Sequence, residues 1–347
     1  MTGRSQVGSV KDLEVIKSPS DNDTGIGRFH FSDRYSVFDW GEMPDHIQNK
    51  GAAISVLSAY FFERLEDMGI KTHYLGLVEN GKRKRLSGLS APSRIMEITL
   101  LRVLKPVEKD GIYDYGCYRD AAGNFLIPLE IIYRNSLPVG SSVFKRLEKG
   151  ELTPGDLGLA EMPSPGERLR EPAIDVSTKL EITDRYISWD EAGEMANLSE
   201  VEIEGIREIT SKVNKLITDE FDRIGLVNED GKIELGFSPE RSLMVVDVLG
   251  TLDECRFTFE GIPVSKEIAR IYYRGSSWHE EVERAKRTDR MRWKELVKAG
   301  PEPLPGRLRD LISKVYASCT NEITGRDWFP GVPDTREILA GIREFIG

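Results

Sequence analysis

Cysteine and histidine are scarce in this sequence, which limits the metal and redox sites that it can build. The 347 residues include three cysteines and four histidines. The cysteines, Cys117, Cys255 and Cys319, are far apart and form no C-x-x-C pair, and the histidines form no H-E-x-x-H pattern. We therefore expect neither a disulfide framework nor a zinc site, and unpaired cysteines fit the reducing cytoplasm.

Long apolar runs and a surplus of basic residues are also lacking. No segment approaches the roughly 20 apolar residues that a membrane-spanning helix needs, and the first residues show no apolar core of a signal peptide. The formal net charge is −10, whereas general nucleic-acid binders need a basic surface for the phosphate backbone. We therefore expect a cytoplasmic globular protein with no membrane and no nucleic-acid partner, although a local cluster of cations can still bind a small anion.

The spacing of apolar residues predicts several helices. The segments 51–69 and 201–225 place apolar residues on one helix face, and each ends in a glycine. From about residue 263 onward the chain is mostly helical, with one highly charged and one amphipathic segment. Together with the strands predicted below, this pattern indicates a mixed α+β fold with a helical C-terminal end.

Strands are predicted in the first three quarters of the chain. One apolar strand ends at Pro106, and two strands over 111–135 are expected to meet at a turn over 120–124. The segment 148–172 is rich in proline and glycine and predicts a long surface loop. Two short strands follow at KIELGF and SLMVVDVLG, with a turn at Asp230–Gly231 ahead of the first.

Two polar clusters near the N-terminus could bind an anion. In GSVKD, Gly8 lets the backbone approach a phosphate and Lys11 adds charge, unless Lys11 is an ordinary surface lysine after a loop glycine. In SDRYSVFD, Asp33, Ser36 and Asp39 supply the donors and acceptors that a sugar-phosphate site needs. Alternatively, Asp33 forms an ordinary ion pair and Ser36 caps a turn. The patterns alone leave both interpretations open.

Two further clusters lie in the middle of the chain. In YRNSLPVGSS, Arg134 offers a guanidinium that can bind phosphate or carboxylate through two hydrogen bonds, and Ser141 lies among small residues that suit an anion. The alternative is an arginine that closes a strand before a Gly-Ser turn. STKLEITD adds Lys179 and Asp184 in a similar setting.

The segments DGKIELG and VVDVLG form the most informative cluster. Lys232 and Glu234 are two residues apart and therefore share one face of a strand. Asp247 interrupts an apolar run, so its carboxylate must be paired, hydrogen-bonded or bound to a cation. Glu234 and Asp247 could hold Mg²⁺ on ATP phosphates through oxygen ligands, and Arg256 follows shortly after. The alternative is a solvent-facing hairpin with ordinary charge pairs.

Taken together, GSVKD, SDRYSVFD, NKG, YRNSLPVGS, STKLEITD, DGKIELG and VVDVLGTLDECRF resemble the motifs of the SAICAR synthetase (phosphoribosylaminoimidazole-succinocarboxamide synthase) family, in the family's order. The resemblance implies an N-terminal, mostly antiparallel β lobe over 1–104, a central α/β ATP-binding lobe over 105–262 and C-terminal helices over 263–347. It also implies an ATP-dependent ligase of de novo purine biosynthesis. ATP would activate the carboxylate of carboxyaminoimidazole ribonucleotide as an acyl phosphate, and the amine of L-aspartate would displace phosphate to give SAICAR.

The resemblance also implies roles for the residues that match the motifs. On the nucleotide side, Gly8 and Lys11 would lie by the ATP phosphates, Lys232 would approach the nucleotide, and Glu234 and Asp247 would hold its Mg²⁺.

On the substrate side, the expected contacts come from seven residues. They are Arg134, Ser141, Lys179, Asp184, Arg256, Asp39 and Lys50. Catalytic roles are expected for Lys232, Arg134 and Asp184.

Two residues depart from the family pattern. Ser9 stands where a lysine usually follows the glycine, and Val248 stands where a second acidic residue usually follows Asp247. Alternatives therefore stay open: a related ligase with another amine or carboxylate, a non-catalytic nucleotide-binding protein of the same fold, or a kinase. The kinase motifs H-R-D and D-F-G do not occur. The sequence does not fix the oligomeric state and is compatible with a homo-oligomer.

Overall fold

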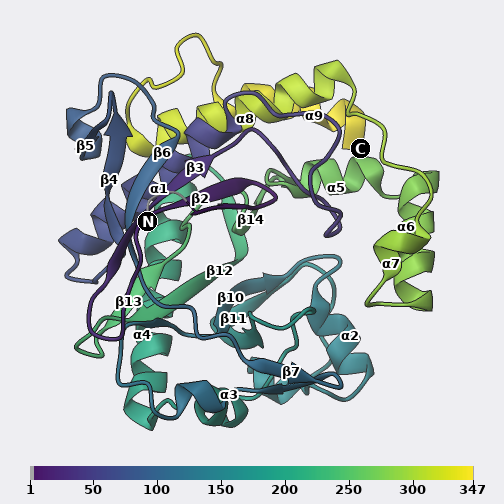
Figure 1. Cartoon of the computed structure of the whole chain (residues 1–347). Helices are drawn as coiled ribbons and strands as arrows, with labels where there is room; N and C mark the ends of the chain where they lie inside the picture. The colour runs from purple at the N-terminus through teal and green to yellow at the C-terminus, as the bar shows by residue number, and fades with distance from the viewer. Residues whose placement is uncertain (1–3, 347) are drawn as a thin grey trace.

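Two antiparallel sheets frame the molecule in the computed structural model, which describes residues 4–346 (Figure 1). The N-terminal sheet has the strand order β1-β2-β3-β6-β4-β5. Its strands are β1 (Arg4–Val7), β2 (Lys11–Lys17), β3 (Gly25–Phe31), β4 (Tyr74–Glu79), β5 (Lys82–Lys84) and β6 (Ile95–Leu100). The helix predicted over 51–69 is confirmed as α1 (Lys50–Asp67), and it packs against β3, β4 and β6.

The second sheet carries the central part of the chain. Its main path is β11-β10-β12-β14-β15, and β9 and β13 also pair with β12. The strands are β9 (Phe125–Leu126), β10 (Leu129–Leu137), β11 (Glu167–Thr178), β12 (Val227–Phe237), β13 (Leu243–Val246), β14 (Cys255–Phe259) and β15 (Ile262–Pro263). The second predicted helix is confirmed as α4 (Glu200–Asp222), which packs on β10 and β12.

Helices dominate the C-terminal end, as the sequence predicts. They are α5 (Glu267–Tyr273), α6 (Ser277–Thr288), α7 (Trp293–Leu296), α8 (Gly306–Thr324) and α9 (Thr335–Ile346). The helix α8 lies against α1 and α9, so it covers the N-terminal sheet from the side of α1 (Figure 1). Two shorter helices, α2 (Ser142–Glu148) and α3 (Trp189–Ala196), flank the second sheet. No helix within residues 4–346 is long and apolar enough to cross a membrane.

One hydrophobic core joins the two sheets. Phe221 of α4 stacks on Phe257 of β14 with ring centroids 3.8 Å apart, and its ring also faces Phe61 of α1 at 6.1 Å. These three side chains are almost fully buried. The α+β fold class is therefore confirmed, whereas the division at residues 104 and 262 stays a prediction.

Three local predictions are wrong. The strand Ile112–Asp114 (β8) pairs with Val107–Lys109 (β7), not with β10, because Asp110 and Gly111 both have positive φ angles and close a two-residue turn. The segment 148–172 is also less irregular than expected, since β11 already begins at Glu167.

The third error concerns Asp230–Gly231, which lies inside β12 and makes no turn. Here the glycine allows a close approach, because a Cβ at Gly231 would collide with the hydroxyl group of Tyr133 on the neighbouring strand. The Asp-Gly dipeptide therefore forms a turn at residues 110–111, whereas at residues 230–231 it lies within β12 and allows close packing.

Candidate active site

One face of the second sheet is charged. Side chains alternate between the two faces of a strand, so Asp230, Lys232 and Glu234 of β12 point to the same side. The register places Arg134 of β10 opposite Asp230. The intervening Ile233 of β12 is buried in the core. Sequence alternation thus separates a charged face from the face that α4 covers.

A cavity of 350 Å³ opens over this charged face. It lies between the β1–β2 turn, the loop after β3, the strand β12 and the start of α5. Seven residues that the sequence indicated as site candidates line this cavity together. They are Lys11, Ser36, Asp39, Lys179, Lys232, Glu234 and Asp247.

Lysines and carboxylates alternate within the cavity. Lys11 Nζ lies 2.5 Å from Asp247 Oδ1, Lys179 pairs with Glu234, and Lys232 Nζ lies 2.6 Å from Glu130 Oε1. Three ammonium groups therefore meet three carboxylates in a small volume. Phosphate oxygens could take the place of carboxylate oxygens as partners of such lysines.

The two buried carboxylates differ in their pKa. Burial raises the pKa of Glu234 to about 7, and the charge of Asp247 adds to the increase. Burial also disfavours the charged form of Asp247, but Lys11 and Lys179 outweigh it and hold the pKa of Asp247 below its usual range. The pair therefore concentrates negative charge that nearby cations must balance.

The backbone at Asp247 is unusual and is held in place by a buried histidine. Asp247 has a φ of 63°, which is rare for a residue with a side chain. His73 Nε2 lies 3.0 Å from the backbone oxygen of Asp247. Burial lowers the pKa of His73 to about 4, so the ring is neutral at pH 7 and its Nε2–H can donate to that oxygen.

Arg134 lies in a second cavity on the same side of the sheet. This cavity has a volume of 810 Å³, and Arg146, Arg207 and Tyr186 also line it. Arg134 is mid-strand and 2% exposed, rather than at a strand end as its sequence context predicts. Its Nη2 lies 3.1 Å from Tyr186 Oη, whereas Nε of Arg134 and Nε of Arg146 have no hydrogen-bond partner among the described residues.

Ser141 and Arg256 lie near Arg134 but line neither of these two cavities. Ser141 is buried, and its hydroxyl group accepts a hydrogen bond from the amide of Val143 at the start of α2. Arg256 is bound by Asp230 through two hydrogen bonds, with Nε 2.7 Å from Oδ1. Both side chains therefore already have protein partners.

Gly8 and Lys50 also have structural roles. A Cβ at Gly8 would collide with the backbone oxygen of Lys11, so the β1–β2 turn requires glycine. Lys50 is 1% exposed, and its Nζ lies 2.5 Å from Asp253 Oδ2. Asp253 in turn accepts a hydrogen bond from Tyr316 of α8 at 2.5 Å and lines the cavity that contains Lys232.

Asp33 lies outside these cavities, whereas Asp184 lies in a third one. Asp33 binds Arg94 and accepts a hydrogen bond from the amide of Gly51. Asp184 lines a cavity of 650 Å³ that shares Asp39 with the Lys232 cavity. Burial raises the pKa of Asp184 to about 6, with a further contribution from Glu130.

Sequence reasoning missed four charged residues near the Lys232 cavity: Glu130, Glu254, Lys266 and Arg270. Strand alternation could have found Glu130, which precedes Arg134 by four residues on the same face of β10. Helical spacing could have linked Lys266 and Arg270, which lie one turn apart at the start of α5. Burial lowers the pKa of Lys266, and nearby Arg270 adds to the effect.

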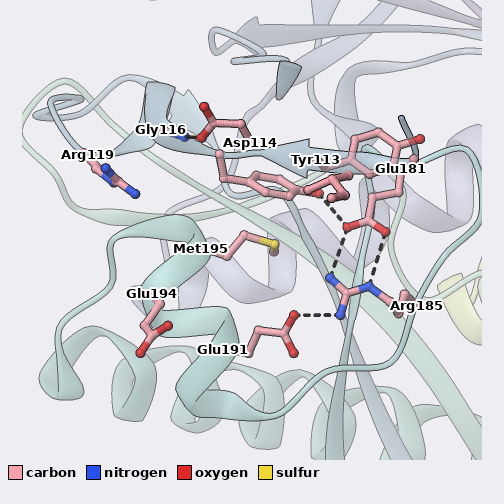
Figure 2. A pocket seen from close by; sticks show the side chains of 12 residues that line it. Tyr113, Asp114, Gly116, Arg119, Glu181, Arg185, Glu191, Glu194 and Met195 are labelled. Atoms are coloured by element: carbon pink, nitrogen blue, oxygen red, sulfur yellow. Dashed lines mark hydrogen bonds and ion pairs between the residues drawn. The ribbon is translucent and has the colours of Figure 1, made fainter. Parts of the chain in front are cut away.

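A further cavity of 470 Å³ lies outside the predicted site, beside the loop that carries Lys179 and Asp184. Figure 2 shows Arg185 between Glu181 and Glu191, with Nη1 2.6 Å from Glu191 Oε1. Glu181 also accepts a hydrogen bond from Tyr115. These contacts hold the loop that carries Lys179 and Asp184 from the side of this further cavity.

Known proteins are similar to this chain over most of its length. The SAICAR synthetase family model matches residues 17–285. An Archaeoglobus fulgidus protein, named provisionally as a phosphoribosylaminoimidazole-succinocarboxamide synthase, is 49% identical over 98% of this chain and 100% of its own length. The enzyme of that name from Thermoplasma acidophilum is 31% identical over 92% of this chain and 98% of its own length.

Solved structures share the fold. The SAICAR synthase of Saccharomyces cerevisiae, solved with SAICAR, has a TM-score of 0.64 and 20% identity, covering 94% of this chain and 96% of its own. A SAICAR synthetase solved with ADP has a TM-score of 0.55 and 23% identity, covering 86% of this chain and 100% of its own. The motif order, the architecture and the full-length similarity agree, and the chain belongs to the SAICAR synthetase family.

Proposed function

We propose that this chain joins the amine of L-aspartate to the carboxylate of carboxyaminoimidazole ribonucleotide, with ATP as the source of energy and SAICAR, ADP and phosphate as products. The observation that carries the proposal is the cavity in which Lys11, Lys179 and Lys232 meet Glu234 and Asp247. Such a cluster can bind and activate a polyphosphate. A non-catalytic member of the family would have no need to keep this many charges buried together, because burying charge is costly.

The reaction requires two bond exchanges. In the first, a carboxylate oxygen attacks the γ-phosphorus of ATP, the bond to the β-phosphate oxygen breaks, and ADP leaves. In the second, the amine nitrogen attacks the acyl carbon, the carbon–oxygen bond to phosphate breaks, and the nitrogen loses a proton. The first exchange is needed because a free carboxylate is a poor electrophile, and the protein contributes mainly position and charge.

Lys11 and Lys232 would bind the phosphates. Lys11 is held at the β1–β2 turn, whose Gly8 permits the tight backbone, and Lys232 projects from β12 into the same cavity. Burial opposes the charge of Lys232, but Glu254, Glu234 and Glu130 together raise the pKa of its ammonium group, which therefore stays charged. A charged lysine at this position can stabilise the phosphate charge that develops during transfer.

Glu234 and Asp247 would hold Mg²⁺ on the nucleotide. Both side chains offer hard oxygen atoms in a buried setting, and Mg²⁺ commonly uses one or two carboxylates together with phosphate oxygens. When bound, Mg²⁺ would neutralise phosphate charge. Val248, at the position of the family's second acid, is buried and adds no ligand.

Arg134 would bind the ribonucleotide, with Ser141 and Arg256 in support. Arg134 lines a large cavity on the same face of the sheet as Lys232, so one substrate could contact both side chains. Asp230 holds Arg134 Nη1 at 3.5 Å and binds Arg256, which keeps the two guanidinium groups beside each other. Two guanidinium groups are well suited to a phosphate.

Asp184 would accept the proton that the amine loses. A carboxylate with a pKa of about 6 is a better base near neutral pH than one with an ordinary pKa. Lys179 follows β11 at the start of the same loop and lines the cavity of Lys232, so it would contact the reacting carboxylate. Asp39 lies between the two cavities, and Lys50 would support the site through Asp253.

The expected setting is a cytoplasmic enzyme that acts on small molecules without nucleic acid. The domain division at 104 and 262 and a homo-oligomeric state are also proposals. They can be tested by limited proteolysis and by light scattering, respectively.

An ADP-release assay tests the function. With ATP, Mg²⁺ and carboxyaminoimidazole ribonucleotide present, we expect ADP to form only when L-aspartate is added, with SAICAR in equal amount. Aspartate-independent ADP release without SAICAR would contradict the proposal.

A further inference from the structure

Asp184 is positioned by its backbone alone. Its carboxylate makes no hydrogen bond and no ion pair in the part of the chain that the structure describes. Lys179, at the other end of the same loop, is fixed twice. Its amide donates a hydrogen bond to the backbone oxygen of Pro128 at 3.1 Å, and its ammonium group pairs with Glu234. Whatever holds the backbone on either side of Asp184 therefore decides where its carboxylate lies.

The loop over residues 179–184 is closed at its base. The amide of Thr178, the last residue of β11, donates a hydrogen bond to the backbone oxygen of Arg185 at 2.9 Å. The amide of Arg185 donates in return to the side-chain oxygen of Thr178 at 3.0 Å. The residue that follows Asp184 is therefore fixed to the end of β11.

The tip of the loop is held by the β7–β8 hairpin and the residue after it. The side chain of Ile182 is 64% exposed, so apolar packing does not fix the tip. Its amide instead donates a hydrogen bond to Tyr113 Oη at 2.9 Å. Tyr115 Oη donates to Glu181 Oε1 at 3.1 Å. Tyr113 of the hairpin and Glu181 of the loop both line the 470 Å³ cavity (Figure 2).

The hairpin itself contributes little to the core. Its two strands pair with each other and belong to neither main sheet, and Val107 and Ile112 are 67% and 74% exposed. Tyr115, directly after β8, is better anchored, because its ring lies 6.1 Å from that of the fully buried Tyr118. Burial and the charge of Glu181 raise the pKa of Tyr115, so its hydroxyl group stays protonated and can donate.

We propose that Tyr113 and Tyr115 are positioning residues that hold the loop so that Asp184 faces the reacting amine. The inference rests on the proposed function, in which Asp184 accepts the proton of that amine. Tyr113 fixes the chain two residues before Asp184, and the contact between Thr178 and Arg185 fixes it one residue after. This short span leaves the carboxylate a narrow range of positions, and proton transfer depends strongly on such geometry.

Hydrogen exchange of the free protein tests the contact without turnover. In the double variant Y113F/Y115F, the loop peptide that contains Ile182 should exchange about fivefold or more faster, because an amide loses its acceptor and the tip loses its support. Y60F is the matched control. The hydroxyl group of Tyr60 on α1 accepts a hydrogen bond from Arg64 at 3.0 Å, and Tyr60 lines none of the four cavities described above. Y60F should leave exchange of the loop unchanged, and unchanged exchange in Y113F/Y115F would overturn the inference.

Steady-state kinetics tests the consequence for the reaction. Y113F/Y115F should lower kcat about tenfold, as loss of two hydrogen bonds that hold a catalytic group can do. KM for ATP and for the ribonucleotide should stay within about twofold of wild type, because the loop acts on the amine. A merely structural role would leave kcat of the folded protein unchanged, as expected for Y60F.

The outcomes separate this inference from the proposed function. A normal kcat in Y113F/Y115F, or a change confined to KM for ATP, would overturn the inference and leave the reaction in place. A wild type without aspartate-dependent turnover would refute the proposed reaction. Faster exchange of the loop in Y113F/Y115F would still support the contact in that case, since exchange is measured without substrates.

Discussion

Replacement of Lys50 by methionine should destabilise the fold through a single buried charge. Lys50 Nζ lies 2.5 Å from Asp253, and the two residues are 1% and 8% exposed. Asp253 has one further strong partner, the hydroxyl group of Tyr316 at 2.5 Å. In Lys50→Met, the aspartate therefore stays buried with the Tyr316 hydrogen bond and without its ion-pair partner, and Lys266 is the remaining nearby cation that lowers its pKa.

The expected loss is about 3–5 kcal/mol in the free energy of unfolding, because removal of one partner leaves an uncompensated buried charge. The exposed pair of Lys215 and Asp219 gives a matched control. Lys215 Nζ lies 2.7 Å from Asp219, but its side chain is 77% exposed. Lys215→Met should therefore cost no more than about 0.5 kcal/mol.

Urea denaturation without substrates measures both variants, and a double variant isolates the pair. Lys50→Met/Asp253→Asn should recover more than half of the loss, since asparagine still accepts from Tyr316 and carries no charge. Burial raises the pKa of Asp253, and Lys50, Lys266 and Tyr316 together hold it below its usual range, so loss of Lys50 should raise it. The deficit of Lys50→Met should therefore shrink as the pH falls and Asp253 takes up a proton. Additive losses in the double variant, or a cost equal to that of Lys215→Met, would refute the reasoning.

Three further predictions concern the site and its supports. Glu234→Ala and Asp247→Ala should each abolish ADP release by weakening the use of Mg-ATP, and near-normal activity in both would reject their proposed role. Arg134→Ala should raise KM for the ribonucleotide about tenfold or more and leave KM for ATP unchanged, because its guanidinium lies in the other cavity. The third concerns His73, whose pKa is lowered to about 4 on folding. In the unfolded chain His73 takes up a proton near pH 6.5, whereas in the folded protein it does so only near pH 4. Protonation therefore favours the unfolded chain, and the wild type should lose up to about 3 kcal/mol of stability as the pH falls from 6.5 towards 4. His73→Gln should lack that part of the pH dependence in urea titrations, and an unchanged slope would contradict it.

The long helices could be predicted from sequence because their signals are local. Apolar spacing and a terminal glycine gave α1 and α4 within a few residues. The hairpin near residue 111 could not be assigned correctly, since Asp110–Gly111 and Asp230–Gly231 are the same dipeptide. Only the backbone of the first has the positive φ angles of a turn, and packing against Tyr133 explains the second.

The site was predictable as a set of residues but not as an arrangement. Family motifs indicated Lys11 and Asp247, yet their contact joins the β1–β2 turn to the end of β13, and no local rule predicts it. The burial of Lys50 could not be predicted either, because a lysine in a polar segment is usually exposed. In the structure Lys50 is 1% exposed, and Tyr316 of α8 binds its partner Asp253. Lys266 and Arg270 line the cavity from α5, and no motif in the sequence links this segment to the strand β12 that carries Lys232.

The aromatic stack of Phe61, Phe221 and Phe257 has a consequence for synthesis of the chain on the ribosome. Phe61 belongs to the first sheet's helix, but its partners come from α4 and β14, which are made much later. Contacts between residues far apart in sequence form slowly, because the intervening chain must first be closed into a loop. The side chain of Phe61 therefore stays exposed until α4 and β14 have been synthesised. A fragment that stops before α4 should aggregate rather than fold.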